Sequence, residues 1–403
     1  MKIVLIGAGS GFGAKSVADI LSFEELRDSE IALVDINPNN LNPVAEYSRK
    51  VAKHYNAPVK ITTALDWRDG ALDGAQYVMT SFAQGGPAYQ GVPFHYEMVI
   101  PREYGIYQSV GDTAGIGGVL RMMRTAGELL DIAEDMKQRC PDAYMLNYVN
   151  PMAMLTNIIN DACPEIKMIG LCHNIQHGIR ELAKWIGVEH KELQYLAAGI
   201  NHLTWFLRFE YLDGRDAYPD LIKAQEDPEL YKGRPVQFEL LKHFGCWTTE
   251  SSGHCAEYLP YFMHRAEERE TLGLPGRETV PEVDDTNPRW HADSDLMKQL
   301  DGREPMPLDR SFEYGMHIMH ALETGNVYRM NLNVMNDGMI TNLPDGYCVE
   351  VPCTTDRTGI HPHSVGALPI HLAALCHGVA DMQRLAADAF LEKDLKKALY
   401  ACY

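Results

Sequence analysis

Residues 2–13 read KIVLIGAGSGFG, and this stretch decides the fold of the N-terminal half. The apolar run from Lys2 to Gly7 predicts a buried strand, which passes directly into a glycine-rich turn that opens a helix. Such a turn lets backbone amides at a helix N-terminus approach a pyrophosphate. The pattern is a variant of the G-x-G-x-x-G fingerprint, because a phenylalanine stands at the third glycine position. It predicts a dinucleotide site made of Gly7, Ala8, Gly9, Ser10, Gly11 and Phe12.

An acidic residue stands at the end of the second predicted strand. The second predicted strand ends at Asp35, 28 residues beyond Gly7. A carboxylate at this place accepts hydrogen bonds from the adenosine ribose and repels a 2′-phosphate, which favours NAD over NADP. The alternative is a plain strand-helix-strand turn with a surface aspartate.

The first 170 or so residues alternate apolar runs with amphipathic stretches, the pattern of a doubly wound parallel sheet covered by helices on both faces. Residues 1–171 are therefore expected to form a Rossmann domain that binds NAD. Its strands are predicted at 2–7, 30–35, 59–63, 76–82, 143–148 and 167–171, and its helices at 14–26, 43–55, 117–138 and 151–162.

Residues 172–403 have a different composition and predict a mixed α+β domain. Antiparallel strand pairs are expected around Tyr195 to Tyr211 and from Tyr328 to Cys353. The charged stretch from Glu267 to Pro305 predicts a loop or short helices, and the amphipathic tail from Pro369 to Tyr400 predicts a helix.

Bulk composition excludes several classes of protein. The formal net charge of −19 disfavours nucleic acid and anionic membranes as partners. No apolar run approaches the roughly 20 residues of a membrane span, and no signal peptide is visible, so a cytoplasmic location is expected. The nine cysteines form no CxxC pair and do not indicate a disulfide framework.

A candidate metal site follows the sixth predicted strand. Cys172, His173 and Asn174 lie there, at the carboxyl edge where open α/β sheets bind their ligands. His202 follows about 30 residues later. A thiolate and an imidazole are good ligands for a divalent ion and leave positions open for water or substrate. From spacing alone, simple packing of these side chains stays an alternative.

Seven motifs, in order along the chain, resemble glycoside hydrolase family 4, the NAD- and metal-dependent glycosidases. The motifs are IGAGS at 6–10, GDTAGIGG at 111–118, NYVNP at 147–151, GLCHN at 170–174, GINH at 199–202, HCAEYLP at 254–260 and VEVP at 349–352. The resemblance implies a lactate/malate dehydrogenase-like arrangement of the two domains. It also implies a homodimer or homotetramer.

The family's chemistry gives each motif a role. The resemblance implies that Cys172 and His202 hold Mn²⁺ or a similar divalent ion against two sugar hydroxyls. It further implies hydride transfer from carbon 3 to NAD, elimination of the glycosidic oxygen after loss of the carbon 2 proton, addition of water, and return of the hydride. NAD would then be recycled rather than consumed.

The same resemblance assigns the acid, the base and the sugar contacts. Tyr258 matches the base for carbon 2, with Tyr261 as an alternative three residues away. His173 is a candidate acid for the leaving oxygen, or else a hydrogen-bond partner of a sugar hydroxyl. Asn150, Asn174 and Asp112 are expected to bind the small sugar substrate.

Substrate identity depends on the residues after the metal cysteine. The α-galactosidase group has Cys-His-Ser-Val there, whereas this chain has CHNI at 172–175. Other segments resemble the α-galactosidase group, and residues 105–113 also resemble an α-galacturonidase branch. An α-galactosidase is therefore expected, with an α-galacturonidase or α-glucuronidase, or an NAD-dependent sugar dehydrogenase with net oxidation, as alternatives.

Overall fold

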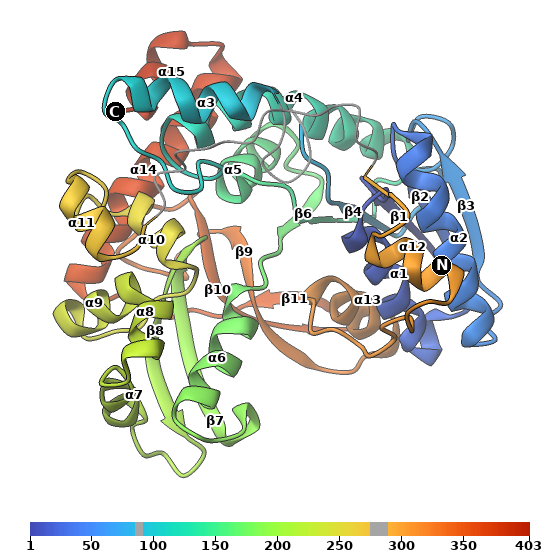
Figure 1. Cartoon of the computed structure of the whole chain (residues 1–403). Coiled ribbons are helices and arrows are strands. Elements are labelled where there is room, and N and C mark those ends of the chain that lie inside the picture. The colour runs from blue at the N-terminus through green and yellow to red at the C-terminus, as the bar shows by residue number, and fades with distance from the viewer. Residues whose placement is uncertain (85–91, 275–288) are drawn as a thin grey trace.

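The computed structural model describes residues 1–84, 92–274 and 289–403. Six parallel strands build the first half in the order β3-β2-β1-β4-β5-β6, which confirms the predicted doubly wound sheet (Figure 1). Strands β1, β2 and β4 consist almost entirely of buried residues, as expected for parallel strands covered on both faces. The bounds are β1 Lys2–Ile6, β2 Glu30–Val34, β3 Lys60–Ala64, β4 Tyr77–Thr80, β5 Tyr144–Asn147 and β6 Lys167–Gly170.

Helices cover both faces of this sheet. Helices α1 and α2 contribute to the apolar core of one face, and α4 and α5 to that of the other. The bounds are α1 Gly11–Ser22, α2 Pro38–His54, α3 Val92–Glu103, α4 Gly115–Arg139 and α5 Met152–Ala162. Helix α3 was not predicted from the sequence.

Helix α2 begins five residues earlier than the sequence predicted. The expected start was Pro43, which lies inside the helix instead. The Asn37 side chain accepts a hydrogen bond from the Asn39 amide, and Pro38 takes the first helical position. This cap and a proline with a suitable φ together start the helix.

The second half extends the same sheet with antiparallel strands. Strand β9 joins β6 through the pair Gly170 and Asn333, and the order continues β9-β10-β7-β8, with β11 paired to β10. Both predicted strand pairs, β7 with β8 and β9 with β10, are confirmed. The bounds are β7 Leu193–Ile200, β8 Leu203–Tyr211, β9 Tyr328–Met335, β10 Cys348–Asp356 and β11 Gly359–Pro362. The domain boundary after residue 171 stays a prediction.

The remaining helices belong in sequence to the second half, and α12, α14 and α15 among them pack against helices of the first half. The predicted tail helix is present as α14 and α15, and the stretch from Glu267 to Pro305 includes short helices α11 and α12, with 275–288 outside the described residues. The bounds are α6 Asn174–Trp185, α7 Tyr218–Ala224, α8 Pro228–Gly233, α9 Pro235–Phe244, α10 Ser252–Tyr258, α11 Ala266–Thr271, α12 Asp295–Asp301, α13 Tyr314–Thr324, α14 Ile370–Glu392 and α15 Leu395–Ala401.

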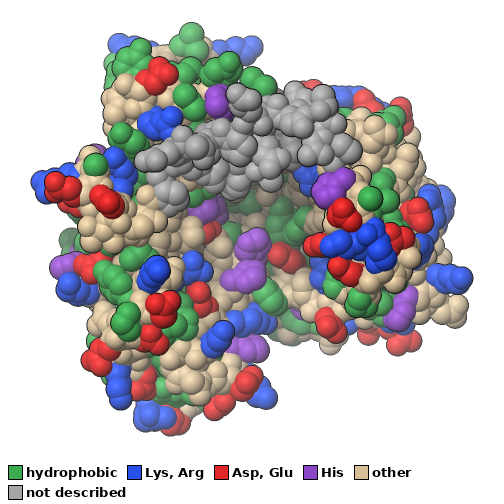
Figure 2. Space-filling view, in the orientation of Figure 1, with side chains coloured by type: hydrophobic (Ala, Val, Ile, Leu, Met, Phe, Trp, Pro, Cys, Tyr) green, Lys and Arg blue, Asp and Glu red, His purple; other side chains and the backbone are tan. Residues whose placement is uncertain are grey.

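The carboxyl ends of β1, β4, β5 and β6 meet at one edge of the sheet, because these strands run parallel. Figure 2 shows the molecule hollowed between its two halves, with histidine and acidic side chains around the hollow. None of the described helices is both long and apolar enough to cross a membrane.

Candidate active site

The glycine loop after β1 leaves no room for side chains at three positions. A Cβ at Gly7, whose φ is +85°, would lie 2.8 Å from the backbone nitrogen of Phe82. At Gly9 it would lie 2.6 Å from the Asp35 carboxylate, and at Gly13 2.2 Å from the Ala8 carbonyl oxygen. The close approach of helix α1 to the loop therefore uses Gly13, one residue after the fingerprint position that Phe12 occupies.

The predicted ribose acceptor stands directly against this loop. Asp35 accepts hydrogen bonds from the amides of Gly9 and Asn37, at 2.9 Å each. These bonds fix the carboxylate at the carboxyl end of β2, where it lines the adjoining cavity. The loop and Asp35 thus have the form of a dinucleotide site.

A cavity of about 610 Å³ joins the predicted cofactor residues to the predicted sugar residues. Its lining includes Gly7, Gly9, Ser10, Phe12 and Asp35 at one end, and Asp112, Asn150 and His173 at the other. Ala8 is buried beneath the loop and Gly11 begins α1, so these two predicted residues contribute backbone structure instead of lining. The cavity is large enough for a ligand that reaches from the glycine loop to the end of β6.

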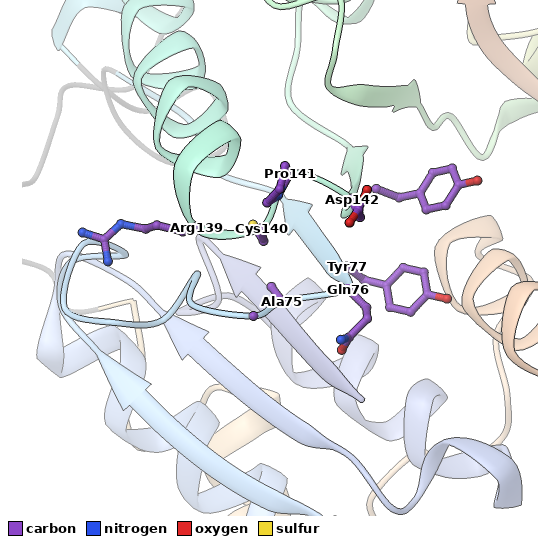
Figure 3. A pocket seen from close by; sticks show the side chains of 9 residues that line it. Ala75, Gln76, Tyr77, Arg139, Cys140, Pro141 and Asp142 are labelled. Atoms are coloured by element: carbon purple, nitrogen blue, oxygen red, sulfur yellow. The ribbon is translucent and has the colours of Figure 1, made fainter.

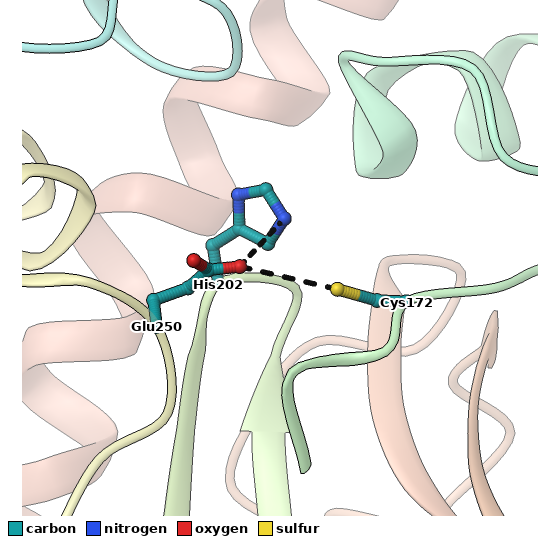
Figure 4. A group of neighbouring side chains, drawn as sticks. All are labelled: Cys172, His202 and Glu250. Carbon is teal, nitrogen blue, oxygen red and sulfur yellow. Dashed lines mark hydrogen bonds and ion pairs between the residues drawn. The ribbon is translucent and has the colours of Figure 1, made fainter. Parts of the chain in front are cut away.

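Three side chains from distant segments converge beyond this cavity (Figure 4). Cys172 follows β6, His202 lies in the turn between β7 and β8, and Glu250 precedes α10. Glu250 Oε1 lies 3.1 Å from His202 Nε2 and 3.9 Å from Cys172 Sγ, and the three ligand atoms lie within 4.8 Å of one another. Sulfur, imidazole nitrogen and carboxylate oxygen form a donor set that suits a borderline divalent ion.

Two of these residues adopt a left-handed backbone that side chains rarely accept. The φ angle is +64° at His202 and +83° at Glu250. Such conformations cost free energy and are concentrated at functional sites. The chain therefore accepts local strain to direct these two side chains toward Cys172.

The protein environment keeps the two predicted ligands neutral in the absence of a metal ion. Burial raises the pKa of Cys172 well above its ordinary value, and the charges of Glu250 and Glu350 add to this effect. Burial lowers the pKa of His202, against the opposing charge of Glu250. A neutral imidazole presents a free lone pair to a metal ion, whereas the thiol must release its proton on binding.

A chain of polar contacts connects this cluster to the predicted sugar residues. His254 Nδ1 lies 3.2 Å from Glu250 Oε2, and His254 Nε2 lies 3.4 Å from Asp112 Oδ1. The Asn150 amide donates to Asp112 Oδ2 at 3.1 Å. His254 therefore connects Glu250 to Asp112, and Asp112 in turn contacts Asn150.

The pKa values of Asp112 and His254, two members of this series of contacts, shift in opposite directions. Burial raises the pKa of Asp112, but the hydrogen bond and charge of His254 outweigh burial and lower the pKa. Burial lowers the pKa of His254, but the charges of Glu250 and Asp112 outweigh burial and raise this pKa to about 9. A charged imidazolium between two carboxylates is therefore the stable state near neutral pH.

The predicted acid and its neighbour lie at the start of α6. His173 Nδ1 is 3.2 Å from Glu313 Oε1, and this hydrogen bond is the main cause that raises the pKa of His173. The side chain of His173 is 50% exposed and lines the cavity. The Asn174 amide donates to Cys172 Sγ at 2.8 Å, so this side chain is directed toward the predicted metal ligand.

The two candidate tyrosines have different environments. Tyr258 is 4% exposed, and its ring lies 6.2 Å from that of His202. Tyr261 is 47% exposed and contacts the ring of Phe244. Burial raises the pKa of Tyr258 well above its ordinary value. Of the two phenols, Tyr258 alone contacts the ring of a predicted metal ligand.

Sequence reasoning missed three carboxylates that organise this site: Glu250, Glu257 and Glu313. Glu257 accepts hydrogen bonds from the amides of Val110, at 2.7 Å, and Gly111, at 3.0 Å, and so holds the loop that carries Asp112. Glu250 and Glu257 both lie in or next to the motif around Tyr258, which was the available signal. Glu313 had no such signal.

A second, smaller pocket of about 340 Å³ lies at the opposite edge of the sheet (Figure 3). Its lining includes Tyr77 and Tyr144, the first residues of β4 and β5. It contains none of the residues that the sequence predicted for the site. Ligands of open α/β sheets bind at the other edge, so this pocket is not the candidate active site.

The fold is that of a Rossmann-type enzyme, with a group of sulfur, nitrogen and oxygen donors near the carboxyl ends of its parallel strands. Comparison with known proteins identifies the family. The model described as "Family 4 glycosyl hydrolase" matches residues 2–188, and the model of the C-terminal domain of the same family matches residues 197–403. The chain belongs to the family 4 glycosyl hydrolases, as the sequence motifs predicted.

Curated relatives include several activities. The chain is 39% identical to an α-galactosidase of Bacillus subtilis (strain 168), over 99% of this chain and 91% of the relative. It is 36% identical to an α-galactosidase of Rhizobium meliloti (strain 1021), over 98% and 81%. It is 26% identical to an α-galacturonidase of Thermoanaerobacterium saccharolyticum, over 100% and 90%.

Solved structures support the fold. A 6-phospho-β-glucosidase of Thermotoga maritima with manganese, NAD⁺ and glucose-6-phosphate has a TM-score of 0.79 at 22% identity, covering 100% of this chain and 92% of that chain. A malate dehydrogenase of Salinibacter ruber has a TM-score of 0.58 at 14% identity, covering 98% and 99%. The predicted lactate/malate dehydrogenase-like arrangement is confirmed.

Proposed function

We propose that this chain hydrolyses α-galactosides with NAD and a divalent metal ion as recycled catalytic groups. One observation carries the proposal: a single cavity extends from the glycine loop to His173 and Asp112, next to the Cys172, His202 and Glu250 cluster. A hydride acceptor and a Lewis acid could therefore reach the same sugar ring.

The residues present fit both groups. The glycine positions that exclude a Cβ let the loop after β1 pass directly into the N-terminus of helix α1, where a pyrophosphate binds in such folds. The cluster supplies sulfur, nitrogen and oxygen donors. We assign the metal to Cys172 and His202, as the sequence predicted, and add Glu250 as a third ligand. When bound, NAD supplies a reversible hydride acceptor for carbon 3, and the metal ion polarises the oxygen on that carbon.

Tyr258 is proposed as the base that removes the proton from carbon 2. Because burial holds its pKa high, the phenol needs a nearby positive charge to ionise, and a metal ion at His202 would supply that charge. His173 is proposed as the acid that protonates the leaving oxygen. Its contact with Glu313 fixes one ring nitrogen and leaves the other available for substrate.

Two observations support galactose over a uronic acid. Two α-galactosidases among the relatives are 36% and 39% identical to this chain, against 26–29% for four α-galacturonidases. The site also contains the carboxylates of Asp112, Glu250 and Glu313, which oppose an anionic glycone. We propose Asn150, Asn174 and Asp112 as the residues that bind its hydroxyls.

The test is a steady-state assay of nitrophenyl α-galactoside and nitrophenyl α-galacturonide with NAD, Mn²⁺ and a thiol, from which each addition is then omitted. Hydrolysis should require all three additions and should prefer the galactoside. NADH should not accumulate, whereas a sugar dehydrogenase would produce NADH in proportion to product. Activity without NAD would refute the proposal.

The fate of hydrogen at carbon 2 gives an independent test. In heavy water, removal and return of the proton should place deuterium at carbon 2 of the released sugar, which nuclear magnetic resonance detects. A product without deuterium would exclude elimination.

We also propose that the protein is cytoplasmic and that it forms a homodimer or homotetramer. The proposed thiol ligand Cys172 agrees with a reducing compartment.

A further inference from the structure

Residues 289–311, called the strap here, belong in sequence to the second half but lie on the first (Figure 1). Helix α12, within the strap, packs against α2. The Trp290 indole donates to the Asn40 carbonyl oxygen at 2.9 Å, and Tyr55 donates to the Leu308 carbonyl oxygen at 3.1 Å. The far end of the strap is held by Arg310, which donates to Ser22 Oγ at 2.7 Å.

These contacts hold the strap so that its first residue, Arg289, lines the cofactor cavity. Arg289 lines the cavity together with Asp35, Ile36, Asn37 and Asn40, which follow β2. Arg121 is the other arginine among the described lining residues, and it lies near Asn150, at the sugar end. The two guanidinium groups therefore serve different ends of the cavity.

The neighbourhood of Arg289 matches the adenosine end of a dinucleotide. In this fold the residues after β2 surround the adenosine ribose, with Asp35 as the hydroxyl acceptor. Burial lowers the pKa of Arg289, and the charge of Asp35 opposes this effect, so the two groups act on each other. A planar guanidinium can stack on an aromatic base and donate hydrogen bonds from its edge at the same time.

We propose that Arg289 binds the adenosine half of the dinucleotide, so that the second half of the chain supplies a residue of the cofactor site. This inference rests on the proposed function in one respect, that the ligand is NAD. The strap gives Arg289 a fixed position because Trp290, its neighbour, is anchored on Asn40.

The experiment measures binding without turnover. NADH fluorescence titration gives the Kd of the full-length protein, and ADP-ribose, which keeps the adenosine half, gives a second Kd by competition. Arg289→Ala should raise both Kd values about tenfold, the size expected for a partly desolvated cation on an aromatic ring. Arg289→Lys should recover only part of this loss, since lysine has no planar group.

Arg303→Ala is the matched control, because Arg303 lies on the same strap but pairs with Asp293 and Asp301 at the surface. Its Kd values should equal those of the unmodified protein. The inference fails if Arg289→Ala leaves both Kd values unchanged, or if the NADH value rises while that of ADP-ribose does not. Failure of the unmodified protein to bind NADH would overturn the proposed function as well.

Discussion

Replacing Glu257 by glutamine should change how the stability of this protein depends on pH. The carboxylate faces the amides of Val110 and Gly111, and burial raises its pKa from 4.5 to about 7, although those two hydrogen bonds oppose the shift. In the unfolded chain the pKa returns to the ordinary value. Between these two pKa values the folded protein binds more protons at Glu257 than the unfolded chain, so stability falls as pH rises.

The magnitude follows from the shift. At about 1.4 kcal/mol per pKa unit, the complete penalty, reached above about pH 8, is roughly 3.5 kcal/mol, of which about 2.5 kcal/mol develops between pH 5 and pH 8. Glu257→Gln removes this titration and keeps an oxygen that can accept from both amides. The free energy of unfolding of the variant, relative to the unmodified protein, should therefore rise by about 2 to 3 kcal/mol over that range.

Urea unfolding at pH 5, 6.5 and 8, followed by tryptophan fluorescence, measures this difference. The comparison between the two proteins cancels the titration of groups that the substitution does not touch. A difference that stays constant with pH, or a variant that loses stability relative to the unmodified protein as pH rises, would refute the raised pKa of Glu257.

Three further predictions concern the site itself. Gly13→Ala places a Cβ 2.2 Å from a backbone oxygen and should abolish NADH binding in a fluorescence titration, whereas Gly11→Ala, whose nearest atom would be 3.9 Å away, should bind normally. Tyr258→Phe should lower kcat by about 10²- to 10⁴-fold, the usual contribution of a general base. Tyr261→Phe should retain kcat, and equal effects of the two substitutions would remove Tyr258 from the mechanism. Asp112→Asn should weaken Mn²⁺ binding by about 10- to 100-fold, because Asp112 holds His254, which in turn contacts Glu250. Electron paramagnetic resonance measures this affinity, and an unchanged value would contradict the role of Asp112 in supporting the metal site.

Much of the fold could be predicted because its signals are local. The apolar runs of β1 and β2, the glycine loop between them and the periodicity of α4 are all properties of short windows of sequence. The start of α2 was misplaced at Pro43 because the cap at Asn37 decides the boundary.

The residues of the site could be predicted only where they belong to a sequence motif. Cys172, His202 and Tyr258 belong to family motifs, and the structure brings the first two within reach of one ion. Glu250 joins them because an unusual backbone conformation turns its side chain inward, which composition and spacing do not reveal. Glu313 reaches His173 from the start of helix α13, and such a long-range contact depends on the tertiary fold.

The junction between β6 and β9 has a consequence for synthesis of the protein. Gly170 and its partner Asn333 are 163 residues apart, so β6 leaves the ribosome long before the strand that covers its edge exists. At a translation rate of about 5 to 20 residues per second, this edge stays open for roughly 10 to 30 s. An unpaired strand edge is a template for aggregation. The first half made alone should therefore need a chaperone or a covering partner to remain monomeric.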